Sequence, residues 1–517
     1  MITISKKIVL RFITMGVLII PIKLNLRAYI EQVDCHILKP HPPLRINMHK
    51  YIQTAAAVFT AIVITTPTLA QDTNAHKAAL VAGYKAAFTC SGTFNAGKTI
   101  ESISNLELNL IYPNYRETLK GLPAAIINEQ EKWVSVKYSI TMPPRISAWR
   151  ENLGCSQLPM GASVDDIAML PKLKLASKNR TLKDKNWPIG DQLTKNKTPA
   201  RLQAVLDKAF DHQTYGEGTE TSAVLVTSAS NMIGEAYRDG YSPFVSQRTW
   251  SVAKSIAVSI IGVAVKEDLL DVKAPAPIPE WQSKGDPRAK ITLENLLHMS
   301  SGLYSGKLGS RTDQLYAGGA RVTDRSTEAP LDAMPGKRWR YANNDTLLSV
   351  RALRASIGDD RKYLAYPFEK LIHKIGMNTT FLETDWEGNF ILSSQVWTTA
   401  RDLGRLGVLY LQDGSWQGEQ ILPKGWATYV STPAPNQPPL QNSAGNPSWG
   451  YGAQFWLLGE RFDLPKDGYL AAGHRGQYIF VIPSKDLVIV RRGYDESGAD
   501  GFNITAFTRD VLKALSN

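Results

Sequence analysis

The chain has 517 residues, of which 43% are hydrophobic, and its formal net charge at pH 7 is +12. This length is sufficient for a large core and for two or three domains. No block of like charge marks a nucleic-acid-binding tail, so we expect no nucleic-acid partner. The metal-binding patterns C-x-x-C and H-E-x-x-H and the nucleotide-binding glycine motifs are absent from the sequence. We therefore expect no metal and no cofactor.

The first 70 residues have the features of an export signal. A short positive region begins at Met48, an apolar run covers 55–64, and small residues end at Ala70. This pattern predicts a signal peptide over 48–70, with residues 1–47 as a spurious extension upstream. The alternative is a membrane anchor in the apolar run that starts at Ile8. Removing the 70 residues, which hold eight basic and two acidic side chains, lowers the charge from +12 to +6.

The predicted signal peptide leads to predictions about the location of the protein and the state of its cysteines. We expect a periplasmic or secreted protein with no stable membrane anchor after signal cleavage. Of the three cysteines, Cys35 lies in the leader, and Cys90 and Cys155 remain. Because exported proteins keep disulfides, we predict a Cys90–Cys155 bond. The alternative is a pair of buried free thiols.

Hydrophobic periodicity divides the rest of the chain. Residues 71–198 form a predicted N-terminal extension and linker, and 199–517 a predicted catalytic domain with a helical lobe at about 291–390. Helical spacing covers 75–88, 199–212, 249–271, 291–303, 398–414 and 505–516. Alternating apolar and polar residues predict a strand pair over 221–241, and two apolar runs around a turn predict another over 477–493. Strands at both ends of the catalytic region predict an α+β fold. Its antiparallel sheet is flanked by helices, and the helical lobe is inserted between the two groups of strands.

The helix that starts near Trp250 carries a serine and a lysine in its first turn. Ser251 and Lys254 are three residues apart, so their side chains share one face. A serine hydroxyl needs a base within hydrogen-bond reach, and a lysine is a base only when it is neutral. Burial against the apolar residues that follow would lower the lysine pKa. The alternative is that Ser251 caps the helix and Lys254 lies on the surface.

Two further segments carry candidate site residues. Tyr341-Ala342-Asn343 offers a phenol that can pass a proton to a leaving group and an amide that can hold a substrate carbonyl. Here the alternative is a loop tyrosine before a helix capped by Asn344.

His474-Arg475-Gly476 stands just before a strand. His474 or Arg475 would bind a substrate carboxylate, and Gly476 would allow close approach of the backbone. The N–H groups of Gln477 and Ser251 would form an oxyanion hole. The alternative is a hairpin glycine between solvated cations.

Taken in order, S-x-x-K, Y-x-N and a basic-x-Gly motif resemble the serine β-lactamase and penicillin-binding-protein superfamily. The surrounding residues resemble its class C branch, and most closely the 6-aminohexanoate-dimer hydrolases and related esterases. The likeness covers 199–517. It implies a β-lactamase-like fold and an acyl-enzyme on Ser251, with Lys254 as base, Tyr341 as proton relay and Asn343 as substrate ligand.

The third motif departs from the usual Lys-Thr-Gly of that superfamily, because His474-Arg475-Gly476 stands in its place. This departure weakens the case for a β-lactam carboxylate. We therefore predict an exported serine hydrolase that cleaves a small ester or linear amide. The alternatives are a class C β-lactamase and a non-turnover protein that recognises penicillin or cell-wall peptide.

Overall fold

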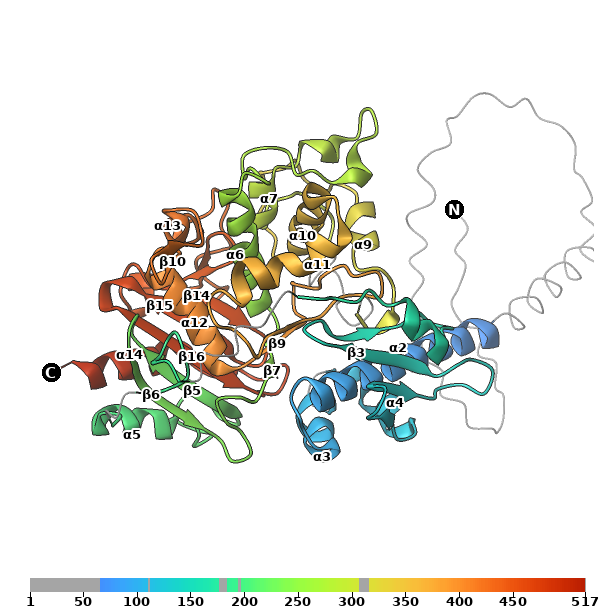
Figure 1. The fold of residues 1–517 in the computed structure, drawn as a ribbon, viewed down its shortest axis with the longest axis horizontal. Coiled ribbons are helices and arrows are strands. Elements are labelled where there is room, and N and C mark those ends of the chain that lie inside the picture. The colour runs from blue at the N-terminus through green and yellow to red at the C-terminus, as the bar shows by residue number, and fades with distance from the viewer. Residues whose placement is uncertain (1–65, 110–111, 176–183, 194–196, 306–315, 517) are drawn as a thin grey trace, which may run out of the picture. The chain divides into compact units, whose positions relative to one another are not determined.

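A seven-stranded antiparallel sheet forms the centre of the catalytic region (Figure 1), in the order β12-β13-β14-β15-β16-β5-β6. The computed structural model describes residues 66–109, 112–175, 184–193, 197–305 and 316–516. The strands are β5 Thr221–Thr227, β6 Met232–Tyr237, β12 Gly450–Tyr451, β13 Trp456–Leu457, β14 Tyr469–Gly473, β15 Gln477–Ile482 and β16 Leu487–Gly493. β5 pairs with β16, so the sheet joins the two ends of the catalytic region as predicted.

Alternation along the strands supplies one core on each face of the sheet. Leu225 of β5 packs in the larger cluster with α6 (Val252–Lys266) and α12 (Ala400–Leu411). Val224 packs in the second cluster, on the opposite face, with α5 (Ala200–Lys208) and α14 (Ile504–Leu515). The fold is therefore the predicted α+β sandwich.

The helical lobe lies between the two groups of strands in the sequence, as predicted. It contains α7 Leu293–Leu297, α9 Asp324–Glu328, α10 Asn343–Ile357 and α11 Asp360–Pro367, followed by a π-helix over Phe368–Ile372. Thr292 caps α7 in a capping box with Asn295. The helix predicted for 291–303 is much shorter in the structure, because it ends at Leu297 and the chain turns at Gly302 with φ +80°. Short strands β10 Ser415–Trp416 and β11 Glu419–Gln420 and helix α13 Trp426–Ser431 follow α12.

The N-terminal extension has its own layer of helices and strands. Helices α2 Thr66–Phe94, α3 Ile100–Ile103 and α4 Arg116–Gly121 pack with a four-stranded sheet of β1 Ile126–Asn128, β2 Trp133–Val136, β3 Arg145–Arg150 and β4 Gly154–Gln157. The Cys90–Cys155 disulfide links α2 to β4, which confirms the predicted pairing. Nearly all of the predicted leader lies outside the described residues. Among those residues, no helix has the length and apolarity needed to cross a membrane.

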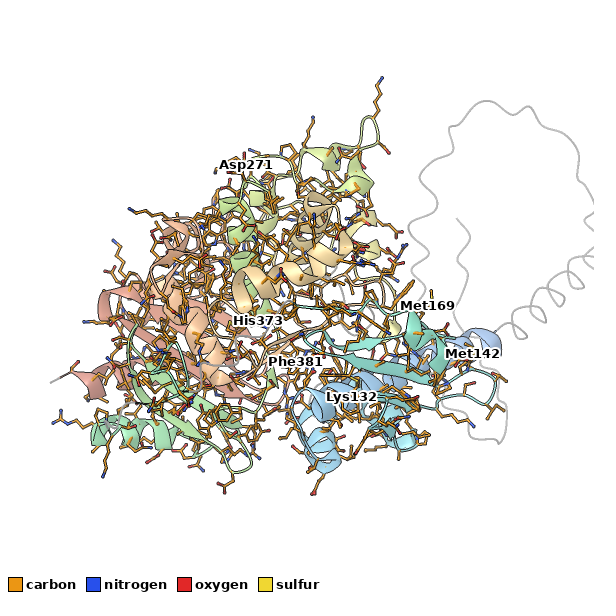
Figure 2. All side chains as sticks on the ribbon, in the orientation of Figure 1. Lys132, Met142, Met169, Asp271, His373 and Phe381 are labelled. Atoms are coloured by element: carbon orange, nitrogen blue, oxygen red, sulfur yellow. A yellow bond between two sulfur atoms is a disulfide. The ribbon has the colours of Figure 1, made fainter. Side chains whose placement is uncertain are left out.

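The extension and the catalytic region belong to one compact unit, Thr68–Asn517. Glu383 is buried in their junction, where its carboxylate accepts hydrogen bonds from Ser91, Asn95 and the backbone N–H of Cys155. Phe381, labelled in Figure 2, contacts the ring of Trp149 with 6.3 Å between centroids. The junction therefore combines apolar contacts with a fully bonded buried carboxylate.

A small sheet brings the junction close to the first turn of α6. Its strands are β7 Gln247–Arg248, β9 Val396–Thr398 and β8 Phe381–Leu382, in the order β7-β9-β8. The N–H of Thr249 continues this pairing by donating to the carbonyl of Val396 at 2.8 Å. The chain thus enters the predicted active site directly from a sheet that the extension supports.

Candidate active site

Ser251 stands at the entrance to α6, after a residue with unusual backbone geometry. Trp250 has φ +51°, a conformation that costs a non-glycine residue about 1–3 kcal/mol. Ser251 occupies the N-cap position, yet its side chain makes no capping hydrogen bond. The alternative in which Ser251 serves as a capping residue is therefore wrong. Its hydroxyl remains available for other contacts.

Lys254 is buried beneath Ser251, with a side chain that is 1% exposed. Its Nζ lies 3.3 Å from Oγ of Ser251, and donates to Oδ1 of Asn343 at 2.6 Å and to the carbonyl of Ser393 at 2.7 Å. Burial lowers the pKa of Lys254 from 10.5 to about 7. The alternative of a surface lysine is wrong, because apolar surroundings disfavour the ammonium form.

The contacts of Lys254 suit a neutral amine. A neutral amine has two N–H donors and one lone pair, and the two shorter contacts, to Asn343 and Ser393, take both donors. In the ammonium form the third N–H of Lys254 donates to Oγ of Ser251. Once that proton is lost, the lone pair is left for the hydroxyl of Ser251. This arrangement can accept the serine proton, and the 3.3 Å separation is within the range expected before substrate binds.

Tyr341 reaches the same hydroxyl from the helical lobe. Its side chain is hydrogen-bonded to Ser251, and its ring centroid lies 5.1 Å from Nζ of Lys254. Burial raises the pKa of Tyr341 to about 12, and the bond to Ser251 offsets part of that rise. Tyr341 is therefore a protonated phenol at neutral pH, which suits a donor to a leaving group and does not suit a base.

Asn343 begins α10 and faces Lys254. Helix α10 starts at Asn343, and Ala342 at its N-cap makes no side-chain capping bond. The alternative in which Asn344 caps this helix is therefore wrong. Because Oδ1 of Asn343 accepts from Lys254, the amide positions the amine as well as standing near the nucleophile.

Gly473 lies next to both donors of the predicted oxyanion hole, the N–H groups of Gln477 and Ser251. It pairs with Gln477 across β14 and β15. A Cβ added at Gly473 would lie 3.2 Å from the backbone nitrogen of Ser251 and only 2.3 Å from the carbonyl of Thr249. The strand edge therefore fits against the nucleophile backbone only because residue 473 has no side chain. The Gln477 side chain is itself buried, and its Oε1 accepts from Nε of Arg492.

The consecutive residues of the third motif have different surroundings. Nε2 of His474 contacts Oγ of Ser497 at 2.7 Å, and its ring meets Trp250 edge-on with centroids 5.1 Å apart. Arg475 instead points inward and is 4% exposed. Its guanidinium donates to the backbone carbonyls of Asp495, Tyr494 and Leu106. We therefore assign Arg475 a structural role in place of the predicted binding of a substrate carboxylate.

Gly476 is required by a buried ion pair. It has φ +75°, and a Cβ there would lie 1.7 Å from Nη1 of Arg491 and 2.4 Å from Oδ2 of Asp495. Nη1 of Arg491 donates to the carbonyl of Gly476 at 2.9 Å. Gly476 does lie in the hairpin between β14 and β15, and His474 beside it is exposed, so the alternative of a hairpin glycine between solvated cations fails only at Arg475, which is buried.

The extension packs against the residue that precedes Ser251. Trp250 is 6% exposed and packs in one cluster with Leu80, Val81, Tyr84 and Phe88 of α2. The guanidinium of Arg248 stacks on the Trp250 ring, with Cζ 3.7 Å from the centroid. These contacts fix the residue that precedes Ser251.

Several residues of the site are not predicted by the sequence motifs. Ser393 contributes a backbone carbonyl, which has no side-chain signature. Its hydroxyl is hydrogen-bonded to Tyr316, which lies in no motif. Trp339 also lies outside the motifs, but the sequence does carry a signal for it. It lies two residues before Tyr341, a spacing that places both side chains on one face of an extended segment. The two rings lie 6.5 Å apart.

Comparison with known proteins identifies the family of this chain. The sequence model of the Beta-lactamase family matches residues 206–491. The 6-aminohexanoate-dimer hydrolase of Paenarthrobacter ureafaciens is 23% identical over 323 residues, which cover 58% of this chain and 79% of that protein.

Two solved structures are similar to this chain at low identity. A family VIII carboxylesterase has 12% identity and a TM-score of 0.49, covering 62% of this chain and 98% of its own. A D-stereospecific amidohydrolase from Streptomyces has 15% identity, a TM-score of 0.44 and the same two coverages. Because the family match spans more than half of the sequence, the chain belongs to the beta-lactamase family and is a serine hydrolase of that superfamily.

Proposed function

We propose that this protein is an exported hydrolase that cleaves a small ester or linear amide through an acyl-enzyme on Ser251. The observation that carries the proposal is the contact of Ser251 with two groups in complementary protonation states. Lys254, with its pKa near 7, is a base, and Tyr341, with its pKa near 12, is an acid. Such a pair of separated pKa values is typical of general acid–base catalysis.

The acylation step follows from these positions. Oγ of Ser251 bonds to the substrate carbonyl carbon while its proton moves to Nζ of Lys254. The bond from that carbon to the leaving oxygen or nitrogen then breaks. The leaving atom takes a proton from Tyr341, which regains one from Lys254. The negative charge on the carbonyl oxygen is held by the N–H groups of Ser251 and Gln477, each worth about 3 kcal/mol.

Deacylation restores the enzyme. A water molecule bonds to the acyl carbon and gives its proton to Lys254, and the bond to Oγ of Ser251 breaks as the serine regains a proton. Asn343 holds the Lys254 amine through this cycle.

Three observations support the finer parts of the proposal. The inward turn of Arg475 removes one cation from the candidate set for a β-lactam carboxylate, which favours esters and linear amides. The curated relative is named for hydrolysis of a 6-aminohexanoate dimer. The Cys90–Cys155 disulfide supports export, since such bonds persist in oxidising compartments.

The test combines labelling and turnover. A fluorophosphonate probe should label Ser251, as located by peptide mass spectrometry, and p-nitrophenyl acetate should be hydrolysed by wild type but not by Ser251→Ala. Ser255→Ala is a matched control, since Ser255 lies one residue beyond Lys254 and donates to the carbonyl of Gln454. Ester turnover that survives in Ser251→Ala would reject this site. A stable adduct without turnover would favour a recognition protein, and faster nitrocefin hydrolysis would favour a β-lactamase.

A further inference from the structure

A cluster of indole rings connects Tyr341 to a groove. The ring of Tyr341 lies 5.3 Å from that of Trp456, which in turn lies 6.2 Å from Trp339 and 5.8 Å from Trp449. Beyond these rings is a groove of about 640 Å³. It is lined by Trp339, Pro438, Pro439, Gln441, Asn442, Ser443, Pro447, Ser448, Trp449 and Trp456.

The lining defines what the groove can hold. As the structure describes it, none of these lining residues carries a formal charge. Three indoles and three prolines give it an apolar surface, and its amides and hydroxyls lie in the 441–448 segment. Indole rings stack on other aromatic rings, and each such contact stabilises the bound ring beyond the effect of burying its apolar surface. The groove therefore suits an uncharged apolar ring.

The position of the groove decides which end of a substrate it receives. The phenol of Tyr341 contacts Ser251, and in the proposed mechanism it protonates the leaving atom. The ring of Tyr341 also contacts Trp456, and Trp456 lines the groove. A chain that extends from the leaving atom past Tyr341 thus reaches Trp456 first and the groove next.

We infer that the groove binds the leaving group of the substrate, and that this group is an uncharged alcohol or amine bearing an apolar ring. The inference rests on the proposed function, because it takes Ser251 as the attacking atom and Tyr341 as the proton donor. It adds the substrate class: esters or amides whose large apolar part is on the alcohol or amine side.

Three esters with alkyl-type leaving alcohols test this assignment. Ethyl acetate is the reference, 2-phenylethyl acetate has the ring on the leaving group, and ethyl phenylacetate is an isomer of the latter with the ring on the acyl group. We expect the ratio of kcat/KM for 2-phenylethyl acetate to that for ethyl acetate to be at least about ten in wild type. Trp449→Ala should lower that ratio about tenfold, equivalent to about 1.4 kcal/mol.

Controls separate the groove from general damage. Trp449 contacts Trp456 and Tyr478 but has no recorded ring contact with Tyr341 among the described residues, so its loss spares the Tyr341–Trp456 contact. Trp449→Phe should restore most of the ratio. Leu440→Ala, in the same segment but 40% exposed and outside the lining, should leave the ratio unchanged.

The contrary outcomes are equally specific. A ratio that is unchanged in Trp449→Ala, or a larger loss with ethyl phenylacetate, would overturn the assignment to the leaving group. Acetylcholine carries a cation at the same position, so faster hydrolysis of acetylcholine than of 2-phenylethyl acetate would show a cation site formed by the ring faces.

A binding measurement separates failure of the groove from failure of the proposed function. Tryptophan fluorescence of Ser251→Ala, titrated with 2-phenylethanol, should change saturably, and the change should weaken in Ser251→Ala with Trp449→Ala. If wild type hydrolyses none of the esters but this titration succeeds, the mechanism is wrong and the groove stands. If the esters are hydrolysed and the titration shows no binding, the groove assignment is wrong.

Discussion

Nζ of Lys254 donates to the backbone carbonyl of Ser393 at 2.7 Å, although the two residues are 139 positions apart. Ser393 follows Glu383 in a segment that Ser91 and Asn95 of the extension hold by hydrogen bonds. The base of the proposed mechanism is thus oriented by a carbonyl from a segment that is tied to a region outside the family match.

Replacing Lys254 should stop acylation. Lys254→Met should lower kcat/KM for p-nitrophenyl acetate by about 10³-fold, a typical loss for a general base. Lys254→Arg should fare no better, because a guanidinium stays protonated at neutral pH. Lys266→Met, in the last turn of the same helix, is the control and should retain wild-type rates. Wild-type kcat in Lys254→Arg would contradict the assignment of a neutral base.

The rate should depend on pH through Lys254. The amine is a base only after it loses its proton, so kcat/KM should rise with pH and reach a plateau above about 7. It should fall again only near pH 12, where Tyr341 loses its proton. A profile of kcat/KM between pH 5 and 10 tests this. A rise centred near 10.5 would mean that Lys254 keeps its ordinary pKa.

The lowered pKa of Lys254 also makes the free energy of unfolding depend on pH. Between pH 7 and 10.5 the unfolded chain holds a proton on Lys254 that the folded protein has released. The contribution of this residue to the free energy of unfolding should therefore rise with pH across that window. Urea denaturation at pH 7 and pH 10 tests this: the free energy of unfolding of wild type minus that of Lys254→Met should be greater at pH 10 than at pH 7. An equal difference at both values would speak against the shift.

Tyr341 should matter most when the leaving group is a poor one. Tyr341→Phe should lower kcat/KM for ethyl acetate by about 10²-fold or more, because ethoxide needs a proton as it departs. The same change should cost less than about tenfold with p-nitrophenyl acetate, whose phenolate is stable without one. Equal losses on both esters would indicate that Tyr341 acts on Ser251 and not on the leaving group.

Gly476 should be among the least replaceable residues of the turn. In Gly476→Ala the methyl group would displace the buried Arg491–Asp495 pair, which should cost about 3–5 kcal/mol. Gly445→Ala is the control, because Gly445 has a similar φ of +80° but no atom within 4 Å of the added Cβ. Its cost should be about 1–2 kcal/mol. Urea denaturation of both variants gives the comparison, and equal losses would contradict the steric argument.

The disulfide should stabilise the extension and, through it, the site. Cys90→Ser with Cys155→Ser opens a link across 65 residues, and the expected loss in the free energy of unfolding is about 4 kcal/mol. Because Cys155 also donates its N–H to Glu383, activity should decline at the same lowered temperature as the fold. Thermal scans followed by circular dichroism and by ester turnover should coincide. Activity that persists beyond loss of the fold would exclude this coupling.

The sequence predicted the parts of the site that depend on side-chain type and short spacing. Ser251, Lys254 and Tyr341 were found because nucleophile, base and acid need particular functional groups, and the structure brings them together. The sheet was predictable because alternation in 221–241 and the continuous apolar runs in 477–493 are both typical of strands, and such runs fit strands with a core on each face.

Other parts depend on long-range packing, which no local pattern reports. The carbonyl of Ser393 acts through the backbone, so any residue type would supply it. Arg475 was placed near the substrate because an exposed arginine and a buried one look alike in a sequence. Trp187 lies in the predicted linker, and no local pattern reports that it is 4% exposed and donates to Thr227.

The packing of Trp250 against α2 limits how far this protein can be truncated from its N-terminus. A fragment cut at the family boundary, beginning at Leu206, would strip the indole of its aromatic neighbours on α2 and expose it to water. The left-handed backbone that sets the angle of the adjacent hydroxyl would then lose its support. Expression fragments and chimaeras should therefore start upstream of Leu80, because the catalytic unit of this enzyme is larger than its recognisable domain.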